Sequence, residues 1–129
     1  MKLDVETENQ TKYQIPPKKV IEGWILEVLK DKKIATDVEI GLKIVTKEVI
    51  HKFNKKYRKI DSPTDVLSFP IYDKLPFDSK KPILLGDIII CPEIMAENSK
   101  KYGNSQDVEF KKLIVHSTLH LLGYHHKED

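Results

Sequence analysis

The segment from Ile83 to Ile90 constrains the fold more than any other part of the sequence. It reads Ile-Leu-Leu-Gly-Asp-Ile-Ile-Ile, and it is the strand-like stretch richest in apolar residues. A strand with one solvated face alternates apolar and polar residues, whereas a strand covered on both faces is apolar almost throughout. We therefore expect this segment to be a strand at the centre of a sheet.

The remaining segments alternate between strand and helix patterns. Strands are recognised by apolar residues at every second position, and helices by apolar residues at a period of 3.6. In chain order we predict a strand at Lys2–Thr7, a helix opened by Pro16 and Pro17, a strand at Val38–Ile44, a helix capped by Thr46, strands at Asp65–Pro70 and Ile83–Ile90, a helix at Pro92–Tyr102, and a helix from the cap Ser105 through Leu122.

The second predicted helix follows Thr46, whose hydroxyl can cap it. Its apolar residues Val49, Ile50, Phe53 and Tyr57 recur at helical spacing, so we expect them to face inward. Asp61-Ser62-Pro63 ends the helix. Between the last two predicted strands, the charged, proline-containing stretch from Tyr72 to Lys81 is predicted to be a loop.

This order of elements predicts an α+β or mixed α/β fold. We expect a mixed sheet of about four strands, packed with four to five helices. A chain of 129 residues has no room for two independent cores, so residues 1–129 are expected to form one domain. The single cysteine, Cys91, excludes a disulfide within the chain and fits a reducing, cytoplasmic compartment. No signal peptide or membrane span is predicted.

Three C-terminal histidines are spaced to bind one metal ion. His116 and His120 are four residues apart, so on a helix they project from the same face. Gly123 then tolerates the left-handed conformation that ends a helix, and the chain can bring His126 back to the same point. Three imidazoles with a fourth position left to water are typical of a catalytic zinc site. The pattern thus predicts one zinc ion per chain at the C-terminal helix, and it favours hydrolysis.

The histidine spacing is also that of the metzincin proteases, but their general base is missing. Those enzymes carry Glu directly after the first His, whereas this chain has Ser117. A serine hydroxyl cannot replace that carboxylate. The sequence therefore keeps the metal site of the protease pattern without its base.

For three further residues, His51, Glu109 and His125, the sequence gives weaker indications of a role in the site. His125 adjoins His126, so we expect it to point elsewhere, and His51 is predicted to lie at the surface. Glu109 lies seven residues before His116 and shares its helix face, so it is either a hydrogen-bond acceptor for a ligating histidine or an exposed glutamate.

One basic residue differs in type from all the others. The chain has 22 Lys and Arg residues and a formal net charge of +2, and Arg58 is the only arginine. Lys55 and Lys56 belong to the same basic cluster, which is also what a solvated helix face would contain. Because a guanidinium can bind two phosphate oxygens at once, a single arginine among many lysines indicates a phosphate-binding role, with a compositional bias towards lysine as the alternative.

Three segments of the sequence form a specific combination. They are Asn54-Lys55-Lys56-Tyr57-Arg58 leading to Pro63-Thr64-Asp65-Val66-Leu67-Ser68-Phe69-Pro70, then Leu85-Gly86-Asp87-Ile88, then the motif from His116 to His126. Together they resemble the YbeY family of bacterial metal-dependent endoribonucleases. The resemblance spans residues 49–126. In two positions the chain departs from the family, which usually has Gly at position 117 and Asp at position 125. Ser117 is expected to add a side chain beside the metal, and His125 removes a carboxylate.

The resemblance implies zinc on His116, His120 and His126, a functional arginine at Arg58, and a mixed sheet against the metal helix. It also implies single-stranded RNA as the substrate, in maturation of rRNA (the 16S 3′ end) and in ribosome quality control. We expect Lys55 and Lys56 to bind flanking phosphates, and we expect a monomer that acts on RNA and the ribosome.

Two alternatives remain at this point. The first is a zinc peptidase, which needs a carboxylate base that the sequence does not place. The second is a non-catalytic ribosome-assembly factor whose metal stabilises the C-terminal fold. Within the nuclease interpretation, the proton acceptor is a zinc-bound hydroxide, His125 or a substrate group, and either water or the RNA 2′-OH attacks.

Overall fold

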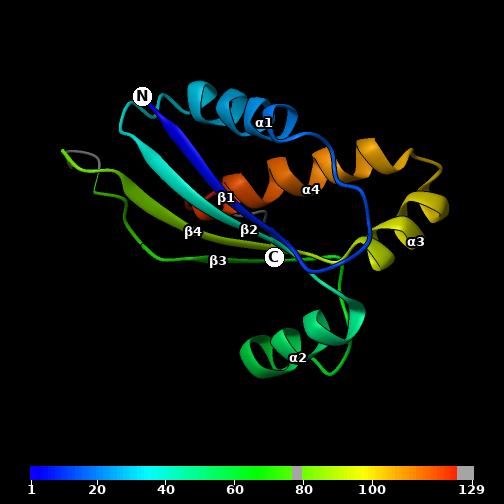
Figure 1. Cartoon of the computed structure of the whole chain (residues 1–129). Helices are drawn as coiled ribbons and strands as arrows, with labels where there is room; N and C mark the ends of the chain where they lie inside the picture. The colour runs from blue at the N-terminus through cyan, green and yellow to red at the C-terminus, as the bar shows by residue number, and fades with distance from the viewer. Residues whose placement is uncertain (77–79, 125–129) are drawn as a thin grey trace.

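The computed structural model describes residues 1–76 and 80–124, and its centre is a mixed β-sheet (Figure 1). The described residues form a four-stranded sheet in the order β1-β2-β4-β3. Strands β1, β2 and β4 are parallel, and β3 pairs antiparallel with β4 at the edge. The bounds are β1 (Leu3–Asn9), β2 (Val38–Ile44), β3 (Val66–Pro70) and β4 (Ile83–Ile90). The expectation that Ile83–Ile90 lies inside the sheet is confirmed.

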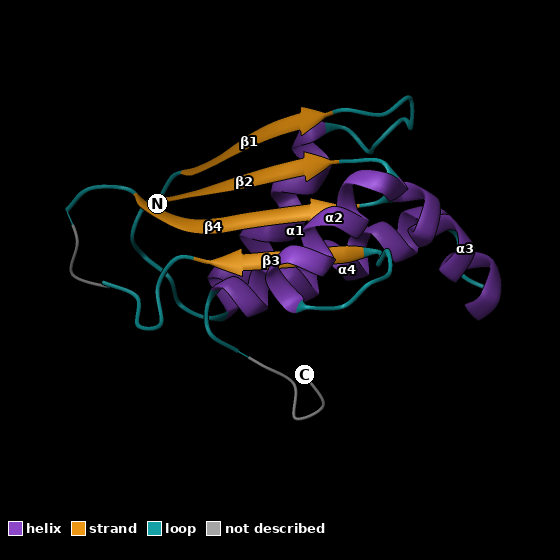
Figure 2. Cartoon of the chain, turned by 90° about the horizontal axis from the view of Figure 1, so that it is seen from below, coloured by secondary structure: helices purple, strands orange, loops and turns teal. Residues whose placement is uncertain are grey.

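Helices cover both faces of this sheet. Helices α1 and α4 pack side by side on one face, with α1 over β1 and α4 over β3 and β4, whereas α2 lies on the opposite face near β3 (Figures 1 and 2). The helices are α1 (Lys18–Asp31), α2 (Lys47–Arg58), α3 (Pro92–Tyr102) and α4 (Gln106–Leu121). The predicted α+β class and the predicted order of elements are confirmed.

Local capping explains where the helices start and stop. The hydroxyls of Thr46 and Ser105 accept hydrogen bonds from the amides of Val49 and Val108, as predicted for N-caps. Gly103 ends α3 in the left-handed conformation. Gly123, just after α4, has a φ of 94°, as its predicted role in ending that helix requires. At the first helix, both prolines precede the helical residues, because Pro17 is the N-cap.

The two faces of the sheet bury separate apolar clusters. The larger one lies under α1 and α4, and its fully buried members include Ile25, Ile40, Ile88 and Phe110. The smaller one lies under α2 and is built from Val45, Ile50, Leu67, Ile89 and Cys91. Burial raises the pKa of the Cys91 thiol, so this cysteine stays protonated in the core.

Of the α2 side chains predicted to face inward, Tyr57 is exposed and Ile50 is buried. Tyr57 was expected to face inward, and this is wrong, because 54% of its surface is exposed. Its place at the last turn of α2 carries it beyond the edge of the small core. Ile50 is fully buried, as expected.

In the described part of the chain, no helix is long and apolar enough to cross a bilayer.

Gly86 allows β4, β3 and α4 to approach closely. Its φ is +148°, and a Cβ atom there would collide with the Phe69 carbonyl oxygen and lie 2.9 Å from Cδ2 of Leu121. The β2–β4 register shifts beside it, between Glu39 and Ile40. Glycine is therefore required at this point, where the sheet edge meets the C-terminal helix.

We predict that Gly86→Ala lowers the free energy of unfolding by roughly 2–5 kcal/mol, because it adds backbone strain to a backbone clash. The matched control is Gly23→Ala in α1, where a new methyl group would meet nothing within 4 Å. Its better helix propensity should stabilise the protein by up to about 1 kcal/mol. Urea denaturation measures both variants, and equal stabilities would contradict the prediction.

Candidate functional site

The predicted metal helix presents two of the three histidines on one face. His116 and His120 lie in the last turns of α4, and both are half-buried. Their spacing of four residues places them one turn apart, as predicted. His125 and His126 lie outside the described residues.

The ring of His120 is oriented by a side chain of the sheet. The Ser68 hydroxyl in β3 makes a short hydrogen bond with Nδ1 of His120, between residues 52 positions apart in the sequence. In the tautomer in which Nδ1–H donates to Ser68, the ring carries its lone pair on Nε2. This is the arrangement of metal-binding histidines, which usually donate their other ring N–H to a neighbouring acceptor.

Ser117 does not share the histidine face. Successive helical residues are about 100° apart, and Ser117 belongs to the face that packs on the sheet, where only 1% of its surface is exposed. Among the described residues, its hydroxyl has no hydrogen-bond partner. Ser117 thus has a core position next to the two histidines, and its expected place beside the metal stays a prediction.

Glu109 shares the helix face of His116, but the structure gives its carboxylate other partners. The side chain is buried, accepts a hydrogen bond of 2.6 Å from Asn104 and lies 3.5 Å from Nζ of Lys112. Seven residues of helix separate it from His116, a rise of about 10.5 Å. Glu109 thus anchors the start of α4 and lies too far along the helix to orient that ring directly.

The basic residues Lys55, Lys56 and Arg58 are all exposed near the C-terminal end of α2. Arg58 is the last residue of the helix, and Lys59 follows in the left-handed conformation. Buried Asn54 holds this turn, because its carbonyl accepts the amides of Lys59 and Ile60 and its side-chain amide donates to the Ser62 carbonyl. The backbone beside Arg58 is therefore anchored although its side chain is exposed.

A histidine and an aspartate also tie the end of α2 to the segment that follows. Nε2 of His51 lies 2.7 Å from Oδ1 of Asp61. The hydrogen bond from His51, followed by the charge of Lys55, lowers the pKa of the Asp61 carboxyl group. The predicted surface position of His51 is confirmed, since 41% of its side chain is exposed. His51 thus supports the turn that carries Arg58.

Strand β3 contacts both α4, which carries the two histidines, and α2, which carries Arg58. Side chains alternate between the two faces of a strand, so Ser68 and Phe69 point to opposite sides of the sheet. Ser68 contacts His120 on the α4 side, whereas Phe69 meets the ring of Tyr57 edge-on at 5.4 Å on the α2 side. Two adjacent residues at the sheet edge therefore hold the two groups of candidate site residues.

A groove of about 300 Å³ lies between α2 and the sheet. The sequence did not predict this groove, because Phe53 and Tyr57 have the helical spacing of core residues, and Phe69 and Asp87 belong only to motifs of the family resemblance. The pattern that could have revealed it is the Phe53–Tyr57 pair at the basic end of a helix. The groove is lined by Lys43, Phe53, Tyr57, Phe69, Asp87 and Ile89.

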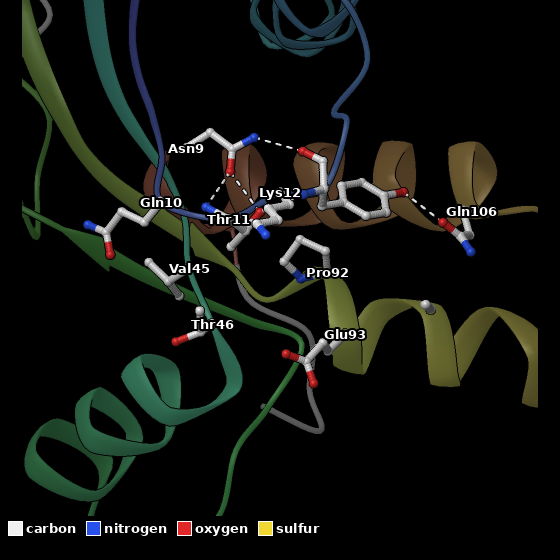
Figure 3. Close-up of a pocket in the computed structure, with 11 residues that line it drawn as sticks. Asn9, Gln10, Thr11, Lys12, Val45, Thr46, Pro92, Glu93 and Gln106 are labelled. Atoms are coloured by element: carbon white, nitrogen blue, oxygen red, sulfur yellow. Dashed lines mark hydrogen bonds between the residues drawn. The ribbon is translucent and has the colours of Figure 1, made fainter.

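A second hollow, of about 840 Å³, opens where β1, β2 and β4 end (Figure 3). None of the predicted site residues lines it. Asn9 accepts hydrogen bonds from Thr11 and donates to the Tyr13 carbonyl, and the Tyr13 hydroxyl lies 2.9 Å from the Gln106 side chain. Burial, followed by the charge of Asp107, raises the pKa of Tyr13, which keeps this phenol neutral. This hollow is separate from the histidine and arginine positions.

The family model described as Endoribonuclease YbeY matches residues 4–129 of the chain. An Endoribonuclease YbeY of Caldicellulosiruptor saccharolyticus is 41% identical, over 100% of this chain and 87% of its own length. That of Lachnospira eligens is 36% identical, over 98% of this chain and 86% of its own.

The fold is similar to a solution structure of a Thermotoga maritima protein. The TM-score is 0.57 and the sequence identity 27%, over 98% of this chain and 76% of the other. The similarity in sequence and the similarity in fold thus both extend across almost all of the chain.

Two hydroxyl deletions in α4 should have different effects on stability. Ser117→Ala removes a buried hydroxyl without a described partner, so we predict no loss of stability, or a gain of up to about 1 kcal/mol. Thr118→Val removes a fully buried hydroxyl that donates to the Ile114 carbonyl at 2.7 Å, and should cost about 1 kcal/mol. Urea denaturation compares the two variants. A larger loss for Ser117→Ala than for Thr118→Val would contradict the burial argument.

Proposed function

Because the chain belongs to the YbeY family and is an endoribonuclease, a hydrolase, we propose that it is a zinc-dependent enzyme that cuts single-stranded RNA. Its place of action is the cytoplasm, in maturation of the 16S rRNA 3′ end and in ribosome quality control. The observation that carries the zinc part of the proposal is the contact of Ser68 with His120.

The proposed zinc ligands are His116, His120 and His126. The donor set suits the ion, because neutral imidazole nitrogens are common zinc ligands. The two histidines within the described residues are half-buried on one helix face, and when Nδ1–H of His120 donates to Ser68, Nε2 of that ring has its lone pair for the metal. His126 completes the set on the basis of its spacing and of the resemblance to the family.

When bound, zinc would supply Lewis-acid chemistry at a phosphoryl oxygen. The described side chains have supporting tasks. Ser68 holds the His120 ring, and Gly86 lets α4 lie close against the sheet edge that carries Ser68. Both keep the histidine face of α4 in a defined position against β3, which a site with an open coordination position requires.

Arg58 is proposed to bind the reacting phosphate and to neutralise charge that develops on it. A guanidinium can donate two parallel hydrogen bonds to two phosphate oxygens, which an ammonium group cannot do. Its backbone is fixed by the Asn54 turn, and its neighbour Tyr57 packs on Phe69, the residue next to Ser68. The exposed Lys55 and Lys56 would hold flanking phosphates, so binding should weaken as salt concentration rises.

The metal assignment predicts one zinc ion per purified chain. His116→Ala combined with His120→Ala should lose that zinc, whereas His51→Ala should retain it, because His51 lies on α2 and pairs with Asp61. Elemental analysis measures the metal. Circular dichroism during chelation separates a catalytic ion, whose removal leaves a folded but inactive protein, from a structural ion. Full zinc content in the double variant would refute the assignment.

The arginine assignment predicts that Arg58→Lys lowers the rate of RNA cleavage about 100-fold or more, with zinc content and fold unchanged. Lys56→Arg makes the reverse exchange on the same helix turn and should cleave at nearly the wild-type rate. Cleavage of a fluorescent single-stranded RNA measures both. A wild-type rate in Arg58→Lys would mean that a point charge is sufficient at this position.

A further inference from the structure

The groove between α2 and the sheet has aromatic walls in an otherwise basic region. The rings of Phe53 and Tyr57 are stacked, with centroids 5.9 Å apart and planes at 19°, and Phe69 meets Tyr57 nearly at right angles. Tyr57 is more than half exposed, so part of its side chain remains accessible to a ligand. An exposed aromatic face beside basic residues is a typical platform for a nucleobase.

The sheet side of the groove carries the carboxylate of Asp87 and the amino group of Lys43. Asp87 and Gly41 are register partners on β4 and β2, and a Cβ atom on Gly41 would collide with the Asp87 carboxylate. The absence of a side chain at Gly41 therefore leaves room for this carboxylate across the strand. Within residues 1–76 and 80–124, neither Asp87 nor Lys43 forms an ion pair with another side chain. Asp87 thus remains available to accept hydrogen bonds from a ligand.

Charge favours a polyanion at the open end of this groove. Lys55, Lys56, Arg58 and Lys59 surround Tyr57 in the sequence, all exposed at the end of α2, and Nζ of Lys56 lies 5.2 Å from the centre of the Tyr57 ring. A peptide would match the aromatic walls but would not use this charge. An RNA chain uses both, because each nucleotide carries a flat base and a phosphate.

We propose that the groove binds one nucleobase of the RNA substrate, stacked on Tyr57 and hydrogen-bonded at its edge by Asp87. The inference rests on the proposed function, since it concerns the same RNA. A carboxylate accepts from the exocyclic amino groups of adenine, cytosine and guanine, which uracil lacks. The groove therefore favours an amino-bearing base over uracil.

The position of the groove also gives a reason for a single-stranded substrate. The histidines lie on the α4 face of β3 and the groove lies on the α2 face, and β3 is the edge strand with β4 as its sheet neighbour. An RNA chain that reaches both must pass over this edge and turn one base into the groove. A single strand can expose a base in this way, whereas a duplex must first break a base pair.

The stacking contact is tested with Tyr57→Leu, and Tyr102→Leu is the matched control. Tyr102 is an exposed tyrosine on α3 with a lysine over its ring, Lys101, but it lies outside the groove. Fluorescence anisotropy measures binding of a short 2′-O-methylated single-stranded RNA, and a denaturing gel verifies that the strand stays intact. Tyr57→Leu should weaken binding roughly tenfold, and Tyr102→Leu should leave it unchanged.

Recognition of the base edge is tested with Asp87→Asn, in which the amide keeps the size of the carboxylate. The wild-type protein should bind a mixed-sequence strand several-fold more tightly than oligouridylate, and Asp87→Asn should remove that difference. Equal binding of the two strands by the wild-type protein would overturn the role of Asp87. Circular dichroism verifies that each variant is folded.

The outcomes separate this inference from the proposed function. If the wild-type protein cleaves single-stranded RNA in a zinc-dependent way but Tyr57→Leu binds as tightly as Tyr102→Leu, the base site is refuted and the nuclease assignment stands. If the wild-type protein neither binds nor cleaves RNA, the proposed function fails and the base site fails with it. Loss of RNA binding in Tyr57→Leu alone supports both.

Discussion

The alternation of side chains along β3 is the constraint on which the candidate site depends. Ser68 points towards α4 and fixes the ring of His120, and its neighbour Phe69 points towards α2 and supports Tyr57 beside Arg58. One short edge strand thus sets the positions of the histidine helix and the arginine helix at the same time. A shift of β3 by one residue would exchange the two faces and separate both helices from their contacts.

Close packing at Gly86 makes this arrangement possible. The backbone of β4 approaches the Phe69 carbonyl and the side chain of Leu121 more closely than any other residue type would permit. On the other face, Gly41 leaves room for the Asp87 carboxylate. Two glycines in neighbouring strands therefore shape the two sides of the sheet on which we place the metal chemistry and the recognition of a base.

Most of the fold could be predicted from the sequence because its signals are local. The apolar run at Ile83–Ile90 identified the inner strand, and Thr46, Ser105 and Gly123 marked helix ends through hydrogen bonds or dihedral angles within a few residues. Prediction failed for Tyr57, whose spacing is that of a core residue. Burial depends on what packs against a helix face, and the small core under α2 ends before the last turn of the helix.

The sequence by itself determined the order of helices and strands, the shared helix face of His116 and His120, and the distinct identity of Arg58 among the lysines. These properties follow from residue type and from spacing within one element. Only the tertiary structure decided that Ser68 orients His120, that Ser117 is buried beside the histidines, and that Asp87 faces an aromatic groove. Each of these depends on contacts between separate elements, and such contacts are created by the packing of the helices on a particular register of the sheet.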